Sequence, residues 1–167
     1  YLGKIVEIGN TQEIFTNQHH PYTRALIDAK PSFVEGENSK AKGLDGIVPD
    51  PARPPQGCRF HTRCTLATDK CGWEVDDVVR WLEDTPGMFE SLDAVERKSE
   101  FSAVLSFSSE IAAANLAMEI RSNKLPSAMR KALTKLKLQE EKLEIEFEPV
   151  NEVVLRENGG RHAACIL

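Results

Sequence analysis

The four cysteines of this sequence constrain its fold more than any other feature. Cys58, Cys64 and Cys71 lie within 14 residues, whereas Cys165 lies close to the end of the sequence. A site that uses all four has to bring residue 165 back to the segment around residue 60. The 93 residues between Cys71 and Cys165 would then form a closed loop. Because closing so long a loop removes chain entropy, the site would hold the fold together as well as carry chemistry.

Length and composition predict a soluble globular protein. The chain has 167 residues, which suffice for one ordinary domain or two small ones, with 41% hydrophobic and 28% charged residues. The sequence has no apolar run of about 18 residues and no signal-peptide pattern, so we expect neither membrane insertion nor secretion. A net charge of −5 argues against a nucleic-acid partner.

The first residue is Tyr1 rather than Met, and we expect the chain to begin within a longer protein. Residues 1–9 combine small and β-branched residues, which predicts a strand. Thr11 is expected to cap a short helix that runs to Phe15, and Pro21 to start a helix over residues 22–29. Residues 31–57 hold five prolines and four glycines, which predicts an irregular arm.

Beyond this arm, hydrophobic periodicity predicts both helices and strands. The expected elements are a short helix over residues 62–68, helices over 75–82, 110–122 and 127–138, strands over 143–147 and 152–156, a turn at 158–160 and a last segment over 161–166. Residues 101–107 fit either a strand or a helix. The predicted fold class is therefore α+β: a small antiparallel sheet with several helices, an irregular Pro-rich arm and a four-cysteine site.

For two of the expected helices, the sequence also predicts which residues form the apolar or the basic face. Ser108 or Ser109 is expected to cap the helix over residues 110–122. Its wide apolar face is expected to comprise two rows of side chains: Ile111, Ala114 and Met118 in one, and Ala113, Leu116, Ala117 and Ile120 in the other. On the helix over residues 127–138, the basic residues Arg130, Lys131, Lys135 and Lys137 are expected to form a solvated face.

The four cysteines match an all-thiolate metal or cluster site, because soft centres prefer thiolate ligands. Structural zinc sites usually contain a pair of cysteines with two to four residues between them, and this sequence has none. The wider spacing favours a 4Fe-4S cluster over zinc. Two disulfides or four unrelated thiols remain alternatives.

The histidines near these cysteines are secondary candidates. His61 and His162 lie within three residues of cysteines and could serve as ligands, although ordinary exposed or hydrogen-bonded roles are expected for both. His19 and His20 have no partner at ligand spacing and are interpreted as structural. Asp76 and Asp77 are adjacent, so on a helix they would diverge into a solvated face rather than form a catalytic pair. No phosphate-binding loop, dinucleotide motif or nucleophile elbow is present.

Several motifs, in this order, resemble the C-terminal end of the ATP-binding subunit of oligopeptide and dipeptide ABC transporters. They are YLGKIVEIGNTQEIF, HPYTRALIDAKPS, GIVPDPARPPQGCRFHTRCTLATDKC and the terminal RHAACIL. The resemblance covers residues 1–73 and about 161–167. Gln18, Thr65 and Ile166 depart from the family pattern, and none of them removes a cysteine. The long insertion over about 74–160 fits an archaeal relative.

The resemblance implies a domain plan and a cofactor. Residues 1–30 would end an ATPase domain, residues 31–57 would form the arm, and residues 58–167 would form an accessory domain. Cys58, Cys64, Cys71 and Cys165 would hold a 4Fe-4S cluster, with zinc as the alternative. ATP and Mg²⁺ would bind only to the catalytic domain upstream of Tyr1, so this chain alone would not be catalytic.

The resemblance also implies partners and a location. They are a second copy or a paralogue of the ATP-binding subunit and the membrane permeases, at the cytoplasmic face of the cell membrane. Three roles for the cysteine site remain open at this point: a structural staple, a redox or iron sensor that regulates transport, and a free-standing zinc-binding interaction module.

Overall fold

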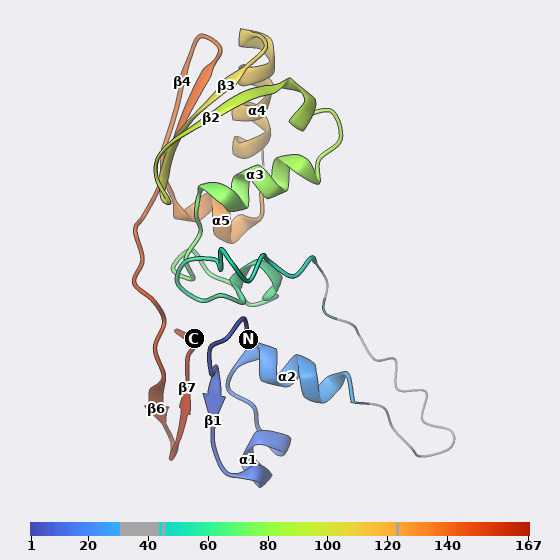
Figure 1. Cartoon of the computed structure of the whole chain (residues 1–167), viewed down its shortest axis with the longest axis vertical. Helices are drawn as coiled ribbons and strands as arrows, with labels where there is room; N and C mark the ends of the chain where they lie inside the picture. Colours follow the sequence, from blue (N-terminus) through green and yellow to red (C-terminus); the bar gives the residue numbers. More distant parts are fainter. Residues whose placement is uncertain (31–43, 45, 123) are drawn as a thin grey trace, which may run out of the picture. The chain divides into compact units, whose positions relative to one another are not determined.

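The computed structural model describes residues 1–30, 44, 46–122 and 124–167 of the chain (Figure 1). The chain divides into two compact units. The first unit combines Tyr1–Ala67 with Glu152–Leu167, and the inserted unit is formed by Thr68–Asn151. Helices and two small antiparallel sheets make up these units, which confirms the predicted α+β class. The domain boundaries at residues 30, 57 and 74 stay predictions.

The first unit is built on a three-stranded sheet of order β1-β7-β6. Strand β1 is Glu7–Ile8, β6 is Arg156–Asn158 and β7 is Arg161–Ala163. The central strand β7 pairs with both neighbours in antiparallel register, with Ala163 opposite Glu7 on one side and Arg156 on the other. The first and last segments of the sequence therefore share one sheet.

The ends of these strands differ from the sequence prediction. Gly159 and Gly160 have positive φ angles of 61° and 84°, which form the predicted turn between β6 and β7. The strand predicted over residues 152–156 is wrong except for Arg156 itself. The strand predicted over residues 1–9 is reduced to two residues, because Tyr1 to Lys4 form a turn closed by the Lys4 amide, which donates to the Tyr1 carbonyl.

Two helices follow β1 in the first unit. Helix α1 is Thr11–Thr16, and Asn10 rather than Thr11 is its N-cap, since the Asn10 side chain accepts from the Glu13 amide at 3.0 Å. Helix α2 is Pro21–Asp28, close to the predicted bounds, with Pro21 in its first turn. Residues 62–68 were predicted to be helical, but only the short 3₁₀ helix η1, His61–Arg63, forms there. The described residues of the predicted arm, 44 and 46–57, contain no helix or strand, and the rest of the arm lies outside the described residues.

The inserted unit holds a four-stranded antiparallel sheet of order β2-β3-β5-β4. Its strands are Leu92–Ser99 (β2), Ser102–Phe107 (β3), Leu133–Gln139 (β4) and Lys142–Phe147 (β5). Its helices are Val75–Glu83 (α3), Glu110–Arg121 (α4) and Ser127–Ala132 (α5), and a 3₁₀ helix η2 covers Phe89–Ser91. Strand β3 resolves the ambiguity over residues 101–107.

Alternation along the central strands creates the core of the inserted unit. Every second residue of β3 and β5 is buried, and α4 packs against β3, β4 and β5 (Figure 1). The buried residues of α4 are Ala113, Leu116, Ala117 and Ile120, and Ser109 caps the helix as predicted. Ile111 and Met118 of the other predicted row are 74% and 66% exposed, so the buried face is narrower than expected.

Two sequence predictions fail in this unit. The helix over residues 127–138 ends at Ala132, and the rest of that segment is β4. Leu136 and Leu138 lie opposite Ile145 and Leu143, so apolar residues two positions apart share one face of a strand, with Leu136 half-buried and Leu138 at the exposed end. Only Arg130 and Lys131 of the predicted basic face are helical. Strand β2 is missing from the sequence prediction because its sequence, LDAVERKS, is mostly polar. In the structure only Leu92 and Val95 of this strand are partly buried.

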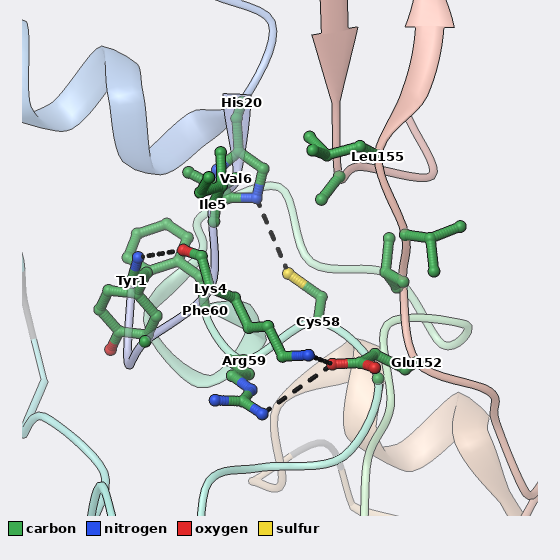
Figure 2. Close-up of a pocket in the computed structure, with 15 residues that line it drawn as sticks. Tyr1, Lys4, Ile5, Val6, His20, Cys58, Arg59, Phe60, Glu152 and Leu155 are labelled. Carbon is green, nitrogen blue, oxygen red and sulfur yellow. Dashed lines mark hydrogen bonds and ion pairs between the residues drawn. The ribbon is translucent and has the colours of Figure 1, made fainter. Parts of the chain in front are cut away.

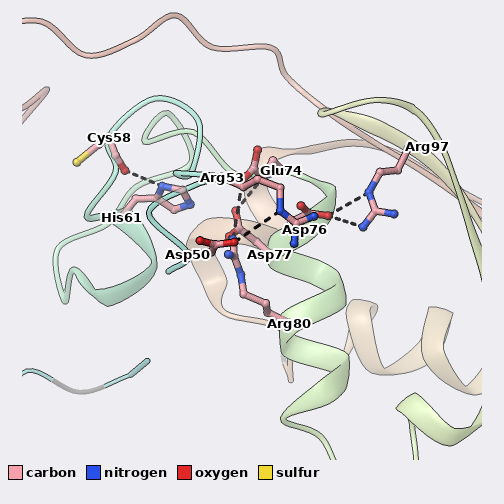
Figure 3. Close-up of polar contacts among 9 residues, drawn as sticks. All are labelled: Asp50, Arg53, Cys58, His61, Glu74, Asp76, Asp77, Arg80 and Arg97. Carbon is pink, nitrogen blue, oxygen red and sulfur yellow. Dashed lines mark hydrogen bonds and ion pairs between the residues drawn. The ribbon is translucent and has the colours of Figure 1, made fainter. Parts of the chain in front are cut away.

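Polar side chains organise the start of α3 (Figure 3). Asp77 accepts from the Glu74 amide at 3.0 Å, and the Glu74 side chain in turn caps the helix. Arg80 donates to Asp77 at 2.6 Å, and Arg97 of β2 donates to Asp76 at 2.6 Å. The solvated face predicted for the two aspartates is therefore wrong for Asp77, which is 3% exposed.

Candidate functional site

The first unit contains a pocket of about 390 Å³ between its two chain segments (Figure 2). The N-terminal segment, the loop after Gly57 and the segment that leads into β6 form its walls. The lining residues are Tyr1, Gly3, Lys4, Ile5, Val6, His20, Gly57, Cys58, Arg59, Phe60, Glu152, Val153, Val154, Leu155 and Ala164. One predicted site residue, Cys58, is among them, and so is Ala164, the neighbour of Cys165.

His20 is buried beside this pocket, with 1% of its surface exposed. Its Nδ1 accepts a hydrogen bond from the Tyr22 amide at 3.1 Å and so caps helix α2. The proton of the neutral ring therefore sits on Nε2, which lies 4.0 Å from the sulfur of Cys58. Burial lowers the pKa of His20 to about 4, although the nearby Glu7 carboxylate acts in the opposite direction. The ring is thus a neutral donor, and its Nε2–H faces Cys58 and the carbonyl of Ala164.

Glu7 fixes the backbone that carries this histidine. Its two carboxylate oxygens accept from the amides of His19 and His20 at 2.8 and 3.0 Å. Burial alone would raise the pKa of Glu7, but the hydrogen bonds from His19, Thr23 and His20 outweigh it and leave the pKa below its ordinary value. Strand β1 and the start of α2 are therefore joined by a charged carboxylate.

The turn that presents Cys58 is held by His61 and Phe60. The His61 ring is 1% exposed and its Nδ1 donates to the Cys58 carbonyl at 2.8 Å. The Phe60 ring is buried against Tyr1 and Tyr22, with centroid distances of 5.2 and 5.4 Å. The hydrogen-bonded role expected for His61 is confirmed, and its Nδ1 is committed to the backbone.

The other cysteines of the first unit follow short regular elements. Cys64 is the C-cap of η1, and its amide donates to the His61 carbonyl at 3.2 Å. Cys165 follows β7, where the Ala164 amide donates to the Val6 carbonyl at 2.8 Å. Both cysteines are half-buried, and His162 on β7 is exposed. The small sheet thus holds the segment before Cys165 beside the N-terminal segment.

Cys71 belongs to the inserted unit and is 6% exposed. Its sulfur accepts from the Thr68 amide at 3.3 Å and lies 3.5 Å from the Thr68 hydroxyl. The Trp73 indole in turn donates to the Thr68 carbonyl at 2.7 Å. Amide donors to sulfur are the contacts that stabilise thiolate ligands, so this turn suits a thiolate.

The chemistry of the four cysteines fits a thiolate-bound centre. Cys71 and Cys165 are free thiols. Within the described part of the chain, no three side chains of His, Cys, Asp or Glu form a group that could hold a metal ion.

Sequence reasoning missed the charged group at the mouth of the pocket. Lys4 and Arg59 both form ion pairs with Glu152, at 2.8 and 3.9 Å (Figure 2). No motif signalled this group, because its members lie in three separate segments. The signal for His20 was present in the HPYT motif, where a histidine before a helix-starting proline occupies the N-cap position.

The matching family is described as the oligopeptide/dipeptide transporter C-terminal region, and it matches residues 6–71. That range includes His20 and the cysteines at 58, 64 and 71. No solved structure matches the chain. No helix of the described residues is long and apolar enough to cross a membrane.

Curated relatives are ATP-binding proteins of peptide transport. A putative peptide import ATP-binding protein of Brucella ovis is 41% identical over 91 residues, which are 54% of this chain and 28% of that protein. The dipeptide transport ATP-binding protein DppF of Haemophilus influenzae is 45% identical over 71 residues, 42% of this chain and 22% of that protein. The di/tripeptide transport ATP-binding protein DppF of Pseudomonas aeruginosa is 40% identical over 78 residues, 47% of this chain and 24% of that protein.

The chain thus spans less than a third of the length of these relatives. Their names agree with the family description and with the motifs around His20 and the cysteines. Residues 6–71 of this chain match the C-terminal region family of oligopeptide/dipeptide transporters.

Proposed function

We propose that this chain is the C-terminal part of the ATP-binding subunit of a peptide importer. The observation that carries the proposal is the family match over residues 6–71, joined to 40–45% identity with peptide-transport ATP-binding proteins. The complete subunit would pair with a second copy or a paralogue and with membrane permeases, at the cytoplasmic face of the membrane. ATP and Mg²⁺ would bind to the catalytic part of that subunit, and the present chain would not hydrolyse ATP.

ATP hydrolysis tests this division of labour. The 167-residue chain should show no hydrolysis above buffer, whereas the complete subunit with its permeases in lipid vesicles should take up a short peptide only when ATP is supplied. Hydrolysis by the chain alone would contradict the accessory role. Uptake of sugars or metal ions in place of peptides would contradict the proposed substrate class.

We propose further that Cys58, Cys64, Cys71 and Cys165 bind one thiolate-ligated centre, a 4Fe-4S cluster or, as the alternative, zinc. Two observations support the cysteines as ligands: amide donation to the sulfur of Cys71, and a buried histidine N–H directed at Cys58. The centre would supply a covalent tie between distant segments. The first proposed role of the centre is therefore structural: as a staple, it would hold these segments together. Redox or iron sensing is the second possible role.

Metal analysis of protein purified without oxygen tests this second proposal. About four iron and four sulfide per chain would identify the cluster, and one zinc would identify the alternative. Cys165→Ser should lower both the bound metal and the thermal midpoint. Ile166→Ser is the matched control, since it places a hydroxyl at the next position without removing a sulfur.

The outcomes separate the roles. Two outcomes would exclude the role of structural staple. One is metal-free wild-type protein, and the other is a Cys165→Ser variant with full metal content and an unchanged thermal midpoint. A reversible reduction that changes the ATPase rate of the complete subunit would favour the sensor, and a rate independent of reduction would exclude it.

A further inference from the structure

Two cations of the first unit share a single carboxylate at the mouth of the pocket. Lys4 Nζ lies 2.8 Å from Oε1 of Glu152, and Arg59 approaches the same oxygen at 3.9 Å. Two positive charges and one negative charge leave a net charge of +1 at this position. The pocket mouth therefore attracts anions.

The carboxylate of Glu152 is held weakly enough to be replaced. The side chains of Lys4 and Glu152 are 51% and 52% exposed. Ion pairs between such exposed groups contribute about 0–1 kcal/mol each. Arg59 is anchored independently, because its guanidinium also donates to the Leu2 carbonyl. Arg59 thus stays in place if Glu152 moves away.

Aliphatic side chains border the cations inside the same pocket. Ile5 and Val154 are 64% and 56% exposed, and Leu155 lines the pocket next to Val154 (Figure 2). Ile5 follows Lys4 directly, and Val154 lies two residues after Glu152, so Lys4 and Glu152 each share a segment with an aliphatic residue that lines the pocket. A volume of about 390 Å³ is within the range of about 300–1,000 Å³ for small-molecule sites.

From these contacts we propose that the pocket binds a small aliphatic carboxylate. Lys4 and Arg59 hold the carboxylate group in place of Glu152, and the aliphatic chain lies against Ile5, Val154 and Leu155. Glu152 then acts as an internal competitor that occupies the cations when no ligand is bound.

A carboxylate fits better than a phosphate for two reasons. The group that already occupies the two cations is itself a carboxylate, and Lys4 and Arg59 lower its pKa, so it is the charged form that they hold. The neighbouring wall is aliphatic and offers a phosphate nothing to bind. Free phosphate and carboxylate share the same attraction to the cations, so the experiment compares both.

The test titrates the 167-residue chain with hexanoate, acetate and inorganic phosphate, followed by NMR shifts of the pocket residues. Hexanoate should bind more tightly than acetate, since only hexanoate reaches the aliphatic wall. Glu152→Gln should tighten hexanoate binding by about tenfold, because it removes the competitor. Lys4→Met should weaken binding by about fivefold.

The opposite signs of these two variants distinguish a ligand site from a structural ion pair. If the ion pairs served only the fold, both variants would loosen the pocket and neither would bind better. Lys142→Met, on the surface of the inserted unit, is the control and should bind like wild type. Absence of hexanoate binding, tighter binding of phosphate than of hexanoate, or no gain with Glu152→Gln would each overturn the proposal.

Discussion

At the scale of single residues, His20 links three segments of the first unit. Its Nδ1 caps α2, its Nε2–H faces Cys58 and the Ala164 carbonyl, and its backbone amide donates to Glu7. From its sequence context, His20 is predicted to be structural. This prediction agrees with its role as the N-cap of α2 but does not include its position beside Cys58, a candidate ligand. A ring with two distinct nitrogens can serve both contacts only in the neutral tautomer that burial favours.

Two substitutions test the roles of the two ring nitrogens of His20 one at a time. His20→Asn keeps an acceptor close to the Nδ1 position, whereas His20→Gln keeps a donor close to the Nε2 position. We expect the Tyr22 amide to exchange about fivefold faster in His20→Gln than in His20→Asn, because losing an N-cap costs about 1 kcal/mol. Hydrogen exchange by NMR measures this, with the Ala164 amide as internal reference for the whole unit.

His162→Asn is the matched control for these variants, because His162 is exposed on β7. It should leave the Tyr22 amide at the wild-type exchange rate. Equal exchange at Tyr22 in His20→Asn and His20→Gln would show that the cap does not depend on Nδ1.

At the scale of elements, the segment 127–139 shows how tertiary pairing decides a local ambiguity. Its apolar residues fit a helix through Met129 and Ala132 and a strand through Leu136 and Leu138. The second half of the segment is a strand because it pairs with β5, where Leu136 and Leu138 lie opposite Ile145 and Leu143. The same pairing places Lys135 and Lys137 on the opposite side, opposite Glu146 and Glu144.

Glu144 on that opposite side joins three strands. It accepts from Lys135 of β4 and Lys98 of β2, at 2.7 and 2.9 Å, and these bonds lower its pKa from 4.5 to about 2. A carboxylate with a depressed pKa stabilises the fold above its unfolded pKa. We therefore expect the free energy of unfolding of the inserted unit to fall as the pH falls from about 4.5 to 2.

Glu144→Gln should remove part of that pH dependence, because glutamine does not titrate. Urea unfolding between pH 2 and pH 5 measures the slope for wild type and variant. Glu146→Gln, an exposed neighbour on β5, is the control and should keep the wild-type slope. Identical slopes in wild type and Glu144→Gln would mean that the two lysines do not stabilise the charged form in the fold.

At the scale of the whole molecule, one unit is inserted into the other. The first unit is completed only when residues 152–167 return to residues 1–67, whereas residues 68–151 are continuous. The inserted unit buries its own core, which includes Leu105, Leu116 and Ile145, each at most 1% exposed. A continuous segment with its own core has what independent folding requires.

We expect residues 68–151, produced alone, to fold into the same four-stranded sheet. A domain of this size should have a free energy of unfolding of about 4–12 kcal/mol. Dispersed NMR spectra that overlay the corresponding signals of the full chain would confirm the prediction. A fragment with the spectrum of an unfolded chain would show that the first unit is needed to stabilise the insertion.

The sequence by itself determined the α+β class, helices α2, α3 and α4, the hairpin at Gly159 and Gly160, and the family motifs. Each of these depends on local signals: proline and serine at helix starts, glycine in a turn, and strict alternation in β5. The cysteine positions are likewise fixed by the sequence, and their role as ligands stays a prediction.

Only the tertiary structure decided the identity of β2 and β4, the buried row of α4, and the pocket where Lys4, Arg59 and Glu152 meet. The physical reason is the same in each case. Each of these features depends on partners that are far away in the sequence. This holds for the mostly polar strand β2, for the choice of the buried row of α4, and for the ion pairs of Glu152. No local pattern encodes those partners.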